Sequence, residues 1–373
     1  MTKVTVVGGG NIGLALCAYL DTSSGVESRL LTTHPGTFSV PIGYTDSATG
    51  DSWTFNIGKV TSDIGEALVG SDLVLMTLPS FSRIAFLDAA LPHLRPGATV
   101  CSVPGYGGTE LAGQRLSQVG VIFAGLDRVP AIARLTPGMV TASKKPSVRC
   151  AAIRGSDTAR VASLLSSVLG LTVESLPNYL SVALTPSNPI LHTSRLYSLF
   201  HNWTAGETWP ANVAFYADWN DEASTLLLEC DAELQAICRA LPEMDLTGVI
   251  PLATHYDAST AEALTAKLRS IPSLHGILSP MRPVDAGFVP DLSSRYFGED
   301  FPYGLCNLKG FAQIVDVPTP HMDRILTWYE RVADKEYFTP GGLGPDAANT
   351  GIPQNWGIST VKDVYEFYNA TCW

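Results

Sequence analysis

The stretch that decides the fold lies near the start of the chain, where residues 4–20 read VTVVGGGNIGLALCAYL. An apolar, strand-like run leads into glycines and then into a helical pattern, and Gly8, Gly10 and Gly13 fit the spacing G-x-G-x-x-G. In such a turn the first glycine makes the bend, the second lets a pyrophosphate approach the backbone, and the third lets the helix pack on the strand. The helix N-terminus then faces the phosphates. The stretch predicts a dinucleotide site whose residues are Gly8, Gly10, Asn11, Ile12 and Gly13.

Beyond this stretch, short apolar runs alternate with helical patterns through the first half of the chain. Strands are expected at residues 3–7, 28–32, 72–78, 99–103, 121–124 and 148–152. Continuous apolar strands that alternate with helices indicate a parallel sheet covered on both faces. Residues 40–60 are rich in turn formers and are expected to form an antiparallel excursion. The alternation therefore predicts an α/β domain of the Rossmann type.

The second half of the chain has a different secondary-structure pattern, dominated by helices. After Pro186 strand signals nearly vanish, and helices are expected at residues 189–201, 222–240, 260–269, 307–314, 320–332 and 360–368. A chain of 373 residues is long for a single hydrophobic core. We therefore expect a dinucleotide-binding domain over residues 1–183 and a helical substrate domain over residues 184–373, with the active site in the cleft between them.

The amino-acid composition argues against several classes of binding partner. The net charge is −11 and no Lys/Arg-rich run occurs, which argues against binding to nucleic acids or anionic membranes. No signal peptide and no apolar run of membrane-spanning length is recognisable, so a cytoplasmic location is expected. The seven cysteines are scattered and form no CxxC pair, so free thiols are expected rather than disulfides or a metal site.

The end of the second strand bears on the choice of cofactor. An NAD site usually has an acidic residue there to hold the ribose hydroxyls, but residues 31–34 read LTTH. The absence of a carboxylate permits a 2′-phosphate, to which Thr33 and His34 could donate hydrogen bonds. No arginine is present to support that phosphate, so the strand end favours NADP over NAD only slightly.

Two polar groups in the second half are candidates for chemistry. In residues 185–197, TPSNPILHTSRLY, Asn188 and Pro189 suit the N-cap and first position of a helix, which places His192 near the positive helix end. In residues 293–305, SSRYFGEDFPYGL, Arg295 could grip a carboxylate and Asp300 could fix the tautomer of a histidine. The alternatives are a histidine in an apolar core and an ion pair that pins a loop. If this segment is extended, Glu299 points elsewhere and is expected to have a structural role.

These motifs together resemble the opine dehydrogenases, the family of octopine and nopaline dehydrogenases. The resemblance implies a Rossmann-type domain followed by an all-α substrate domain, like the C-terminal domain of 6-phosphogluconate dehydrogenase. It also implies condensation of a 2-oxo acid with the amino group of an amino acid and reduction of the imine by NAD(P)H. His192 and Asp300 would be the catalytic pair, Arg295 would bind a substrate carboxylate, and Asn188 would orient the site. The resemblance rests on GGGNIG (8–13), LPHLRPGATVCSVPGYGG (91–108), DRVPAIARLTPG (127–138), SNPILH (187–192), SSRYFGEDFPYGL (293–305) and VDVPTPHMDRIL (315–326).

Some positions depart from the family pattern or leave alternatives open. Arg128 stands where relatives carry threonine, in a segment that helps to form their substrate pocket, and we expect it either to anchor a second carboxylate or to be a surface residue. Pro79 and Pro104, at strand ends, are expected to flank the nicotinamide. The competing interpretations are a ketopantoate reductase-like enzyme that reduces a 2-oxo acid to a hydroxy acid and a non-catalytic NAD(P)-sensing protein. We expect small-molecule substrates and a monomer or homodimer.

Overall fold

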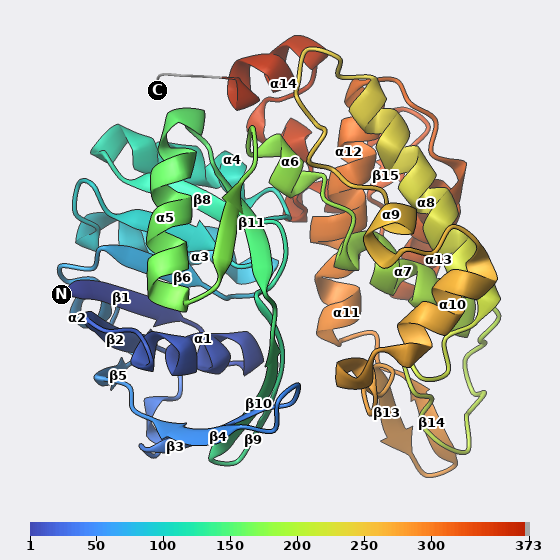
Figure 1. Cartoon of the computed structure of the whole chain (residues 1–373). Coiled ribbons are helices and arrows are strands. Elements are labelled where there is room, and N and C mark those ends of the chain that lie inside the picture. The colour runs from blue at the N-terminus through green and yellow to red at the C-terminus, as the bar shows by residue number, and fades with distance from the viewer. Residues whose placement is uncertain (370–373) are drawn as a thin grey trace. The chain divides into compact units, whose positions relative to one another are not determined.

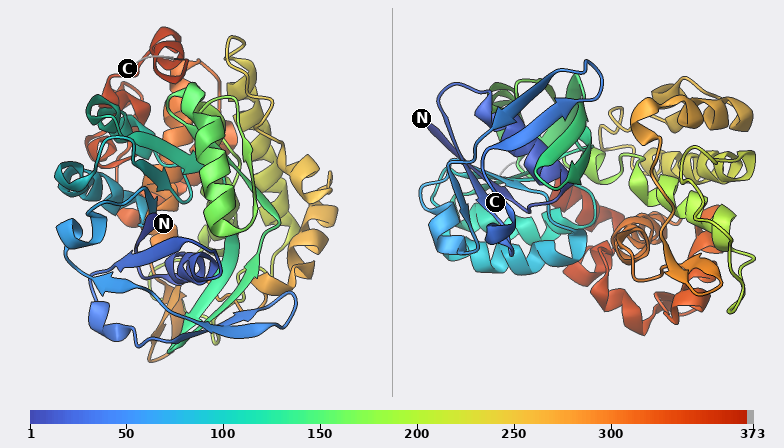
Figure 2. Two further views of the ribbon diagram at one scale, coloured as in Figure 1. Left: turned by 60° about the vertical axis from the view of Figure 1, so that its left-hand side comes forward. Right: turned by 90° about the horizontal axis from the view of Figure 1, so that it is seen from below.

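The glycine stretch forms the predicted strand, turn and helix, as β1 (Thr2–Val7) and α1 (Asn11–Asp21). The computed structural model describes residues 1–369, and the chain divides into two compact units (Figures 1 and 2). Within the described residues, unit one consists of residues 1–183 and 365–369, and unit two of residues 184–364.

The main sheet of unit one has eight strands in the order β12-β11-β8-β7-β6-β1-β2-β5. The pairs from β8 to β5 are all parallel, whereas β11 runs antiparallel to β8 and parallel to β12. The predicted apolar strands are therefore confirmed as one largely parallel sheet. Besides β1, its strands are β2 (Val26–Leu31), β5 (Lys59–Thr61), β6 (Leu73–Met76), β7 (Thr99–Ser102), β8 (Ile122–Leu126), β11 (Ser147–Ala152) and β12 (Thr172–Ser175).

A second sheet has the order β4-β3-β10-β9. The expected antiparallel excursion is confirmed as the hairpin of β3 (Ile42–Asp46) and β4 (Ser52–Phe55). The hairpin of β9 (Ala131–Thr136) and β10 (Met139–Lys144) was not predicted. Its buried positions are mostly small alanines, which give only a weak strand signal.

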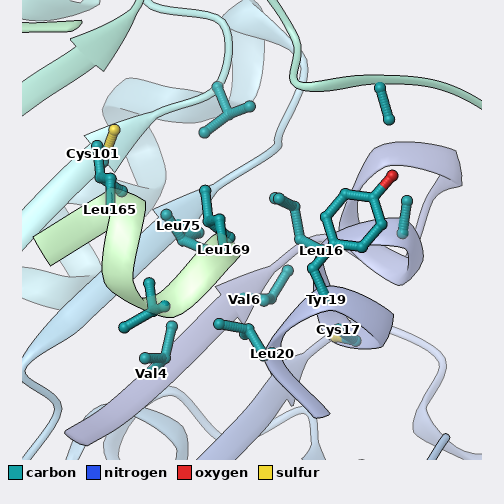
Figure 3. Packing of buried hydrophobic residues seen from close by; sticks show 14 of the residues in the cluster. Val4, Val6, Leu16, Cys17, Tyr19, Leu20, Leu75, Cys101, Leu165 and Leu169 are labelled. Atoms are coloured by element: carbon teal, nitrogen blue, oxygen red, sulfur yellow. The ribbon is translucent and has the colours of Figure 1, made fainter. Parts of the chain in front are cut away.

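The hydrophobic core of unit one lies between the two sheets. Helix α1 packs between them, and α5 (Thr158–Leu169) lies beside it on the same face of the main sheet (Figure 1). Val6 of β1, Leu16 of α1 and Leu165 of α5 are completely buried in this core (Figure 3). The remaining helices are α2 (Ile64–Leu68), α3 (Ser80–Ala90), α4 (Thr109–Gly113) and α6 (Leu180–Ala183).

Unit two is built from helices, as predicted, with two short hairpins added. The helices are α7 (Asn188–Phe200), α8 (Asp221–Arg239), α9 (Leu252–Tyr256), α10 (Ala261–Ser270), α11 (Arg295–Gly298), a π-helix (Asp300–Leu305), α12 (Cys306–Ile314), α13 (Pro320–Ala333) and the start of α14 (Val361–Tyr368). The hairpins pair β13 (Met281–Val284) with β14 (Gly287–Pro290), and β15 (Phe338–Thr339) with β16 (Gly342–Leu343). Short 3-10 turns occupy residues 35–37, 91–93, 114–119, 155–157, 272–274, 345–349 and 353–356.

The cysteines and the helix lengths can be compared with the expectations for residues 1–369. The six cysteines within this part are all free thiols, and Cys372 lies outside the described residues. Over the same residues, none of the helices combines the length and the apolarity that crossing a bilayer requires.

Candidate active site

The predicted cofactor residues of unit one gather at one edge of the main sheet. The glycine loop follows β1, Pro79 is the N-cap of α3 after β6, and Pro104 follows β7. Because β1, β6 and β7 are parallel neighbours, their carboxyl ends lie at the same edge. The chain leaves β1 toward β2 on one side and returns to β6 on the other. Ligands of open α/β sheets bind at such a switch point.

The three glycines of the loop do different jobs. Gly8 has φ +109°, a backbone conformation that other residues rarely adopt. A Cβ atom on Gly13 would lie 1.8 Å from the carbonyl oxygen of Gly8. Glycine is therefore required at position 13 by close packing, and not by an unusual backbone conformation. A Cβ atom on Gly10 would meet no atom within 4 Å, although Gly10 is the N-cap of α1. The space in front of the helix N-terminus is thus open, as a bound pyrophosphate requires.

A cavity of about 810 Å³ lies beside the glycine loop within unit one. Thr33 and His34 are exposed in its wall, and residues 135–138, the end of β9 and the turn toward β10, also line it. Asn11 is exposed, and its Oδ1 accepts a hydrogen bond at 2.9 Å from the backbone N–H of Leu135, which also lines the cavity. The side chain of Ile12 packs against the core.

The predicted catalytic pair forms a direct contact inside unit two. The Nδ1 atom of His192 lies 2.8 Å from Oδ2 of Asp300, although 108 residues separate them in the chain. Both residues are buried, with exposed fractions of 9% and 4%. Burial raises the pKa of Asp300, and the neighbouring imidazole opposes that rise. The two groups can share a proton in a site largely closed to water.

Local sequence explains how these side chains meet. Helix α7 begins at Asn188 with Ser187 as its N-cap, so the expectation that Asn188 caps the helix was wrong by one residue. Pro189 is tolerated in the first turn because the N–H groups there have no helical partner. Asp300 opens the π-helix, a rare form that is common at functional sites. A Cβ atom on Gly304 would lie 2.8 Å from Cβ of Pro189, so glycine lets the π-helix approach the start of α7.

Aromatic residues that were not predicted surround the imidazole. The Tyr216 hydroxyl lies 3.0 Å from Nε2 of His192. The Tyr296 ring centroid lies 4.6 Å from that of the imidazole, and the Phe215 ring meets it edge-on at 5.5 Å. The available signals were the aromatic run in residues 215–219, FYADW, and the tyrosine next to Arg295. Neither pattern indicates by itself which ring contacts a histidine.

The structure places Glu299 against Arg295. These residues lie one helical turn apart, and Nη2 of Arg295 pairs with Oε2 of Glu299 at 2.8 Å. The segment is helical rather than extended, so Glu299 does not point elsewhere but holds the guanidinium. The Arg295 side chain is 67% exposed and that of Glu299 only 7%. The ion pair thus joins an exposed cation to a buried anion, and Asp300 remains with His192.

The other two predicted substrate residues are Asn188 and Arg128. Asn188 is half-buried in the first turn of α7. Arg128 belongs to unit one and follows Asp127, whose carboxylate pairs with Arg149 at 2.8 Å. Burial and the like charge of Arg128 lower the pKa of Lys145 to about 8. Arg128 therefore contributes to a locally cationic region at the end of β8.

Comparisons with known proteins agree with this architecture. Residues 175–333 match the family model described as NAD/NADP octopine/nopaline dehydrogenase, alpha-helical domain. The chain is 26% identical to tauropine dehydrogenase of Arabella iricolor, over 98% of this chain and all of that protein. It is 28% identical to opine dehydrogenase of Haliotis discus hannai, over 97% and 98% of the two chains. A solved structure of octopine dehydrogenase with NADH and L-arginine has a TM-score of 0.83 at 24% identity, and 98% of each chain is covered.

Proposed function

We propose that this chain, whose residues 175–333 match the octopine/nopaline dehydrogenase family model, condenses a 2-oxo acid with the amino group of an amino acid and reduces the imine to an opine. The same site would catalyse the reverse oxidation. The observation that carries the proposal is the buried contact between His192 and Asp300 in the helical part of the chain that matches the family model. The glycine loop supplies the second requirement, a site for the dinucleotide.

In this proposal His192 moves the proton and Asp300 supports it. Condensation of the oxo acid with the amine needs a proton for the oxygen that leaves as water. It also needs a base that removes a proton from the attacking nitrogen, and the reverse reaction needs the opposite transfers. A histidine can serve both steps near neutral pH. The Asp300 carboxylate accepts the hydrogen bond from Nδ1 and favours the imidazolium while His192 holds the extra proton. Nε2 is then the nitrogen that exchanges the proton with substrate.

Arg295 is the proposed anchor for the carboxylate of the oxo acid. A guanidinium binds a carboxylate through two parallel hydrogen bonds, which fixes its orientation as well as its position. Glu299 holds the guanidinium from its buried side, and the exposed side chain of Arg295 is accessible to a ligand. Asn188 would orient the same substrate from the first turn of α7. In unit one, Arg128 would anchor a second carboxylate, and an unchanged KM for both substrates in Arg128→Ala would end that part of the proposal.

The proposed cofactor is NADPH or NADH, with a slight preference for NADPH. When bound, the dinucleotide supplies the hydride. Gly8, Gly10 and Gly13 would receive its pyrophosphate, and Pro79 and Pro104 would flank the nicotinamide. The cavity wall near the second strand offers Thr33 and His34, and within the described residues that line it no carboxylate is present to repel a 2′-phosphate. We also propose that the protein is cytoplasmic, that it is a monomer or a homodimer, and that it has no nucleic-acid partner.

The test is a matrix of 2-oxo acids, amino acids and the two cofactors, with oxidation of NAD(P)H as the readout. We expect turnover that requires both the oxo acid and the amine. Amine-independent oxidation with the oxo acid would instead support a hydroxy-acid reductase, and cofactor binding without turnover would support a sensor.

The matched variants are His192→Ala and His201→Ala, which remove histidines from α7 and from its C-cap position. General acid–base catalysis contributes about 10²–10⁴-fold, so His192→Ala should lose turnover on that scale and keep its cofactor affinity. His201→Ala should retain turnover. Near-normal turnover of His192→Ala would exclude the proposed role of His192.

A further inference from the structure

Both ring nitrogens of His192 have partners. Nδ1 faces Asp300 at 2.8 Å, and Nε2 faces the Tyr216 hydroxyl at 3.0 Å. A phenol hydroxyl can both donate and accept a hydrogen bond, whereas a carboxylate can only accept. In neutral His192 the hydroxyl donates to Nε2, and in the imidazolium Nε2–H donates to the hydroxyl. One arrangement of side chains therefore suits both protonation states.

The loop that carries Tyr216 is held by a buried arginine. Arg195 lies one helical turn after His192 on α7 and is 1% exposed. Its Nε donates to the carbonyl of Phe215 at 3.0 Å, and its Nη2 donates to the carbonyl of Asp218 at 2.7 Å. Burial lowers the pKa of Arg195 to about 10, which leaves the guanidinium charged at neutral pH. The same helix thus positions the imidazole and the loop that contacts its far nitrogen.

Ring packing restricts the Tyr216 side chain itself. The residue is 6% exposed. Its ring stacks on that of Trp219 at 5.9 Å and meets that of Phe215 edge-on at 5.0 Å. Because neighbouring rings fill the space on two sides, the hydroxyl is pre-organised on Nε2 rather than drawn there by a ligand.

We propose that Tyr216 is a positioning residue of the acid–base site, which fixes the His192 ring from the Nε2 side as Asp300 fixes it from the Nδ1 side. This inference rests on the proposed function, because it assumes that Nε2 exchanges the proton. A substrate atom that approaches Nε2 shares or takes over the hydrogen bond, and Tyr216 restores it after the turnover. The ring orientation is then kept through the reaction.

The test compares Tyr216→Phe with Tyr197→Phe, which deletes the same atom from a tyrosine on α7 that stacks on His201. Removal of the hydrogen-bond partner of a metal-bound imidazole typically costs about 10–100-fold in affinity or activity, and we expect the same scale for an imidazole that moves a proton. We expect Tyr216→Phe to lose kcat on that scale with KM for both substrates and for cofactor changed by less than about threefold. Tyr197→Phe should match the unaltered protein.

A second measurement does not depend on activity. In protein labelled with 15N-histidine, the signal of the unprotonated His192 nitrogen, assigned with a His192→Asn variant, should move downfield in Tyr216→Phe because Nε2 loses a hydrogen-bond donor. An unmoved signal, or a moved signal with unchanged kcat, would overturn the inference while the unaltered enzyme and His192→Ala still support the proposed function. An unaltered protein with no amine-dependent turnover would overturn the proposed function and this inference with it.

Discussion

The substitution Asp300→Asn tests the electrostatic half of the site with little change of shape. The asparagine amide keeps the size of the side chain but removes the charge that faces Nδ1 of His192 at 2.8 Å. A hydrogen bond to a charged group contributes about 1.5–3 kcal/mol. If the reaction uses the whole of this interaction in the transition state, kcat should fall about 10- to 150-fold. The amide can also donate to Nδ1 and favour the wrong tautomer, which would add to the loss.

Loss of folding would not explain that result. Burial raises the pKa of Asp300, which shows that the protein interior disfavours its charge. Replacement by a neutral amide removes this cost, so the Tm of Asp300→Asn should be equal to or above that of the unaltered protein. Asp285→Asn, in the exposed turn between β13 and β14, is the matched control.

The assay is steady-state oxidation of NAD(P)H at saturating oxo acid and amino acid, together with the Tm of each variant. We expect Asp285→Asn to behave as the unaltered protein and Asp300→Asn to lose kcat at unchanged cofactor KM. If Asp300→Asn kept the kcat of the control, the contact with His192 would be structural and the Asp300 charge would have no part in the reaction.

Three further substitutions test unit one. Gly13→Ala should reduce the free energy of unfolding by about 1–3 kcal/mol and lower the Tm, because its Cβ would overlap the Gly8 carbonyl. Gly10→Ala should keep the Tm, since its Cβ meets no protein atom, but should weaken NAD(P)H binding in a fluorescence titration. Unchanged affinity in Gly10→Ala would contradict a pyrophosphate at this position. Burial raises the pKa of Glu110 to about 7 from 4.5, so the folded state disfavours the ionised carboxylate. The resulting loss of folding free energy is absent below about pH 4.5 and grows to about 3 kcal/mol as the pH rises to 7. Glu110→Gln should therefore gain Tm over the unaltered protein near pH 8 and lose most of this gain near pH 5; an equal gain at both pH values would argue against the raised pKa.

Much of the architecture could be predicted from local patterns. The glycine spacing, the apolar strands and the long helices are recognisable because each depends on periodicity within a few turns or pleats. The hairpin of β9 and β10 was missed because its small alanines resemble a loop. The start of α7 was displaced by one residue because a proline suits either of the first helical positions.

The candidate site could be predicted only in part. The resemblance to a family paired His192 with Asp300 and left Glu299 without a role, but the helical turn that joins Arg295 to Glu299 was not visible in a stretch rich in Tyr, Phe and Pro. Tyr216 was not predicted, because nothing near it in the sequence indicates that it faces a histidine.

The sequence by itself determined the order of elements, the dinucleotide loop and the residue types available for acid–base chemistry. Only the tertiary structure decided which of these groups touch. Gly304 brings the π-helix against Pro189 and so sets Asp300 on one side of the imidazole. Arg195 holds the carbonyls of a distant loop and so sets Tyr216 on the other. Such contacts depend on packing between segments far apart in the chain, which local periodicity does not encode.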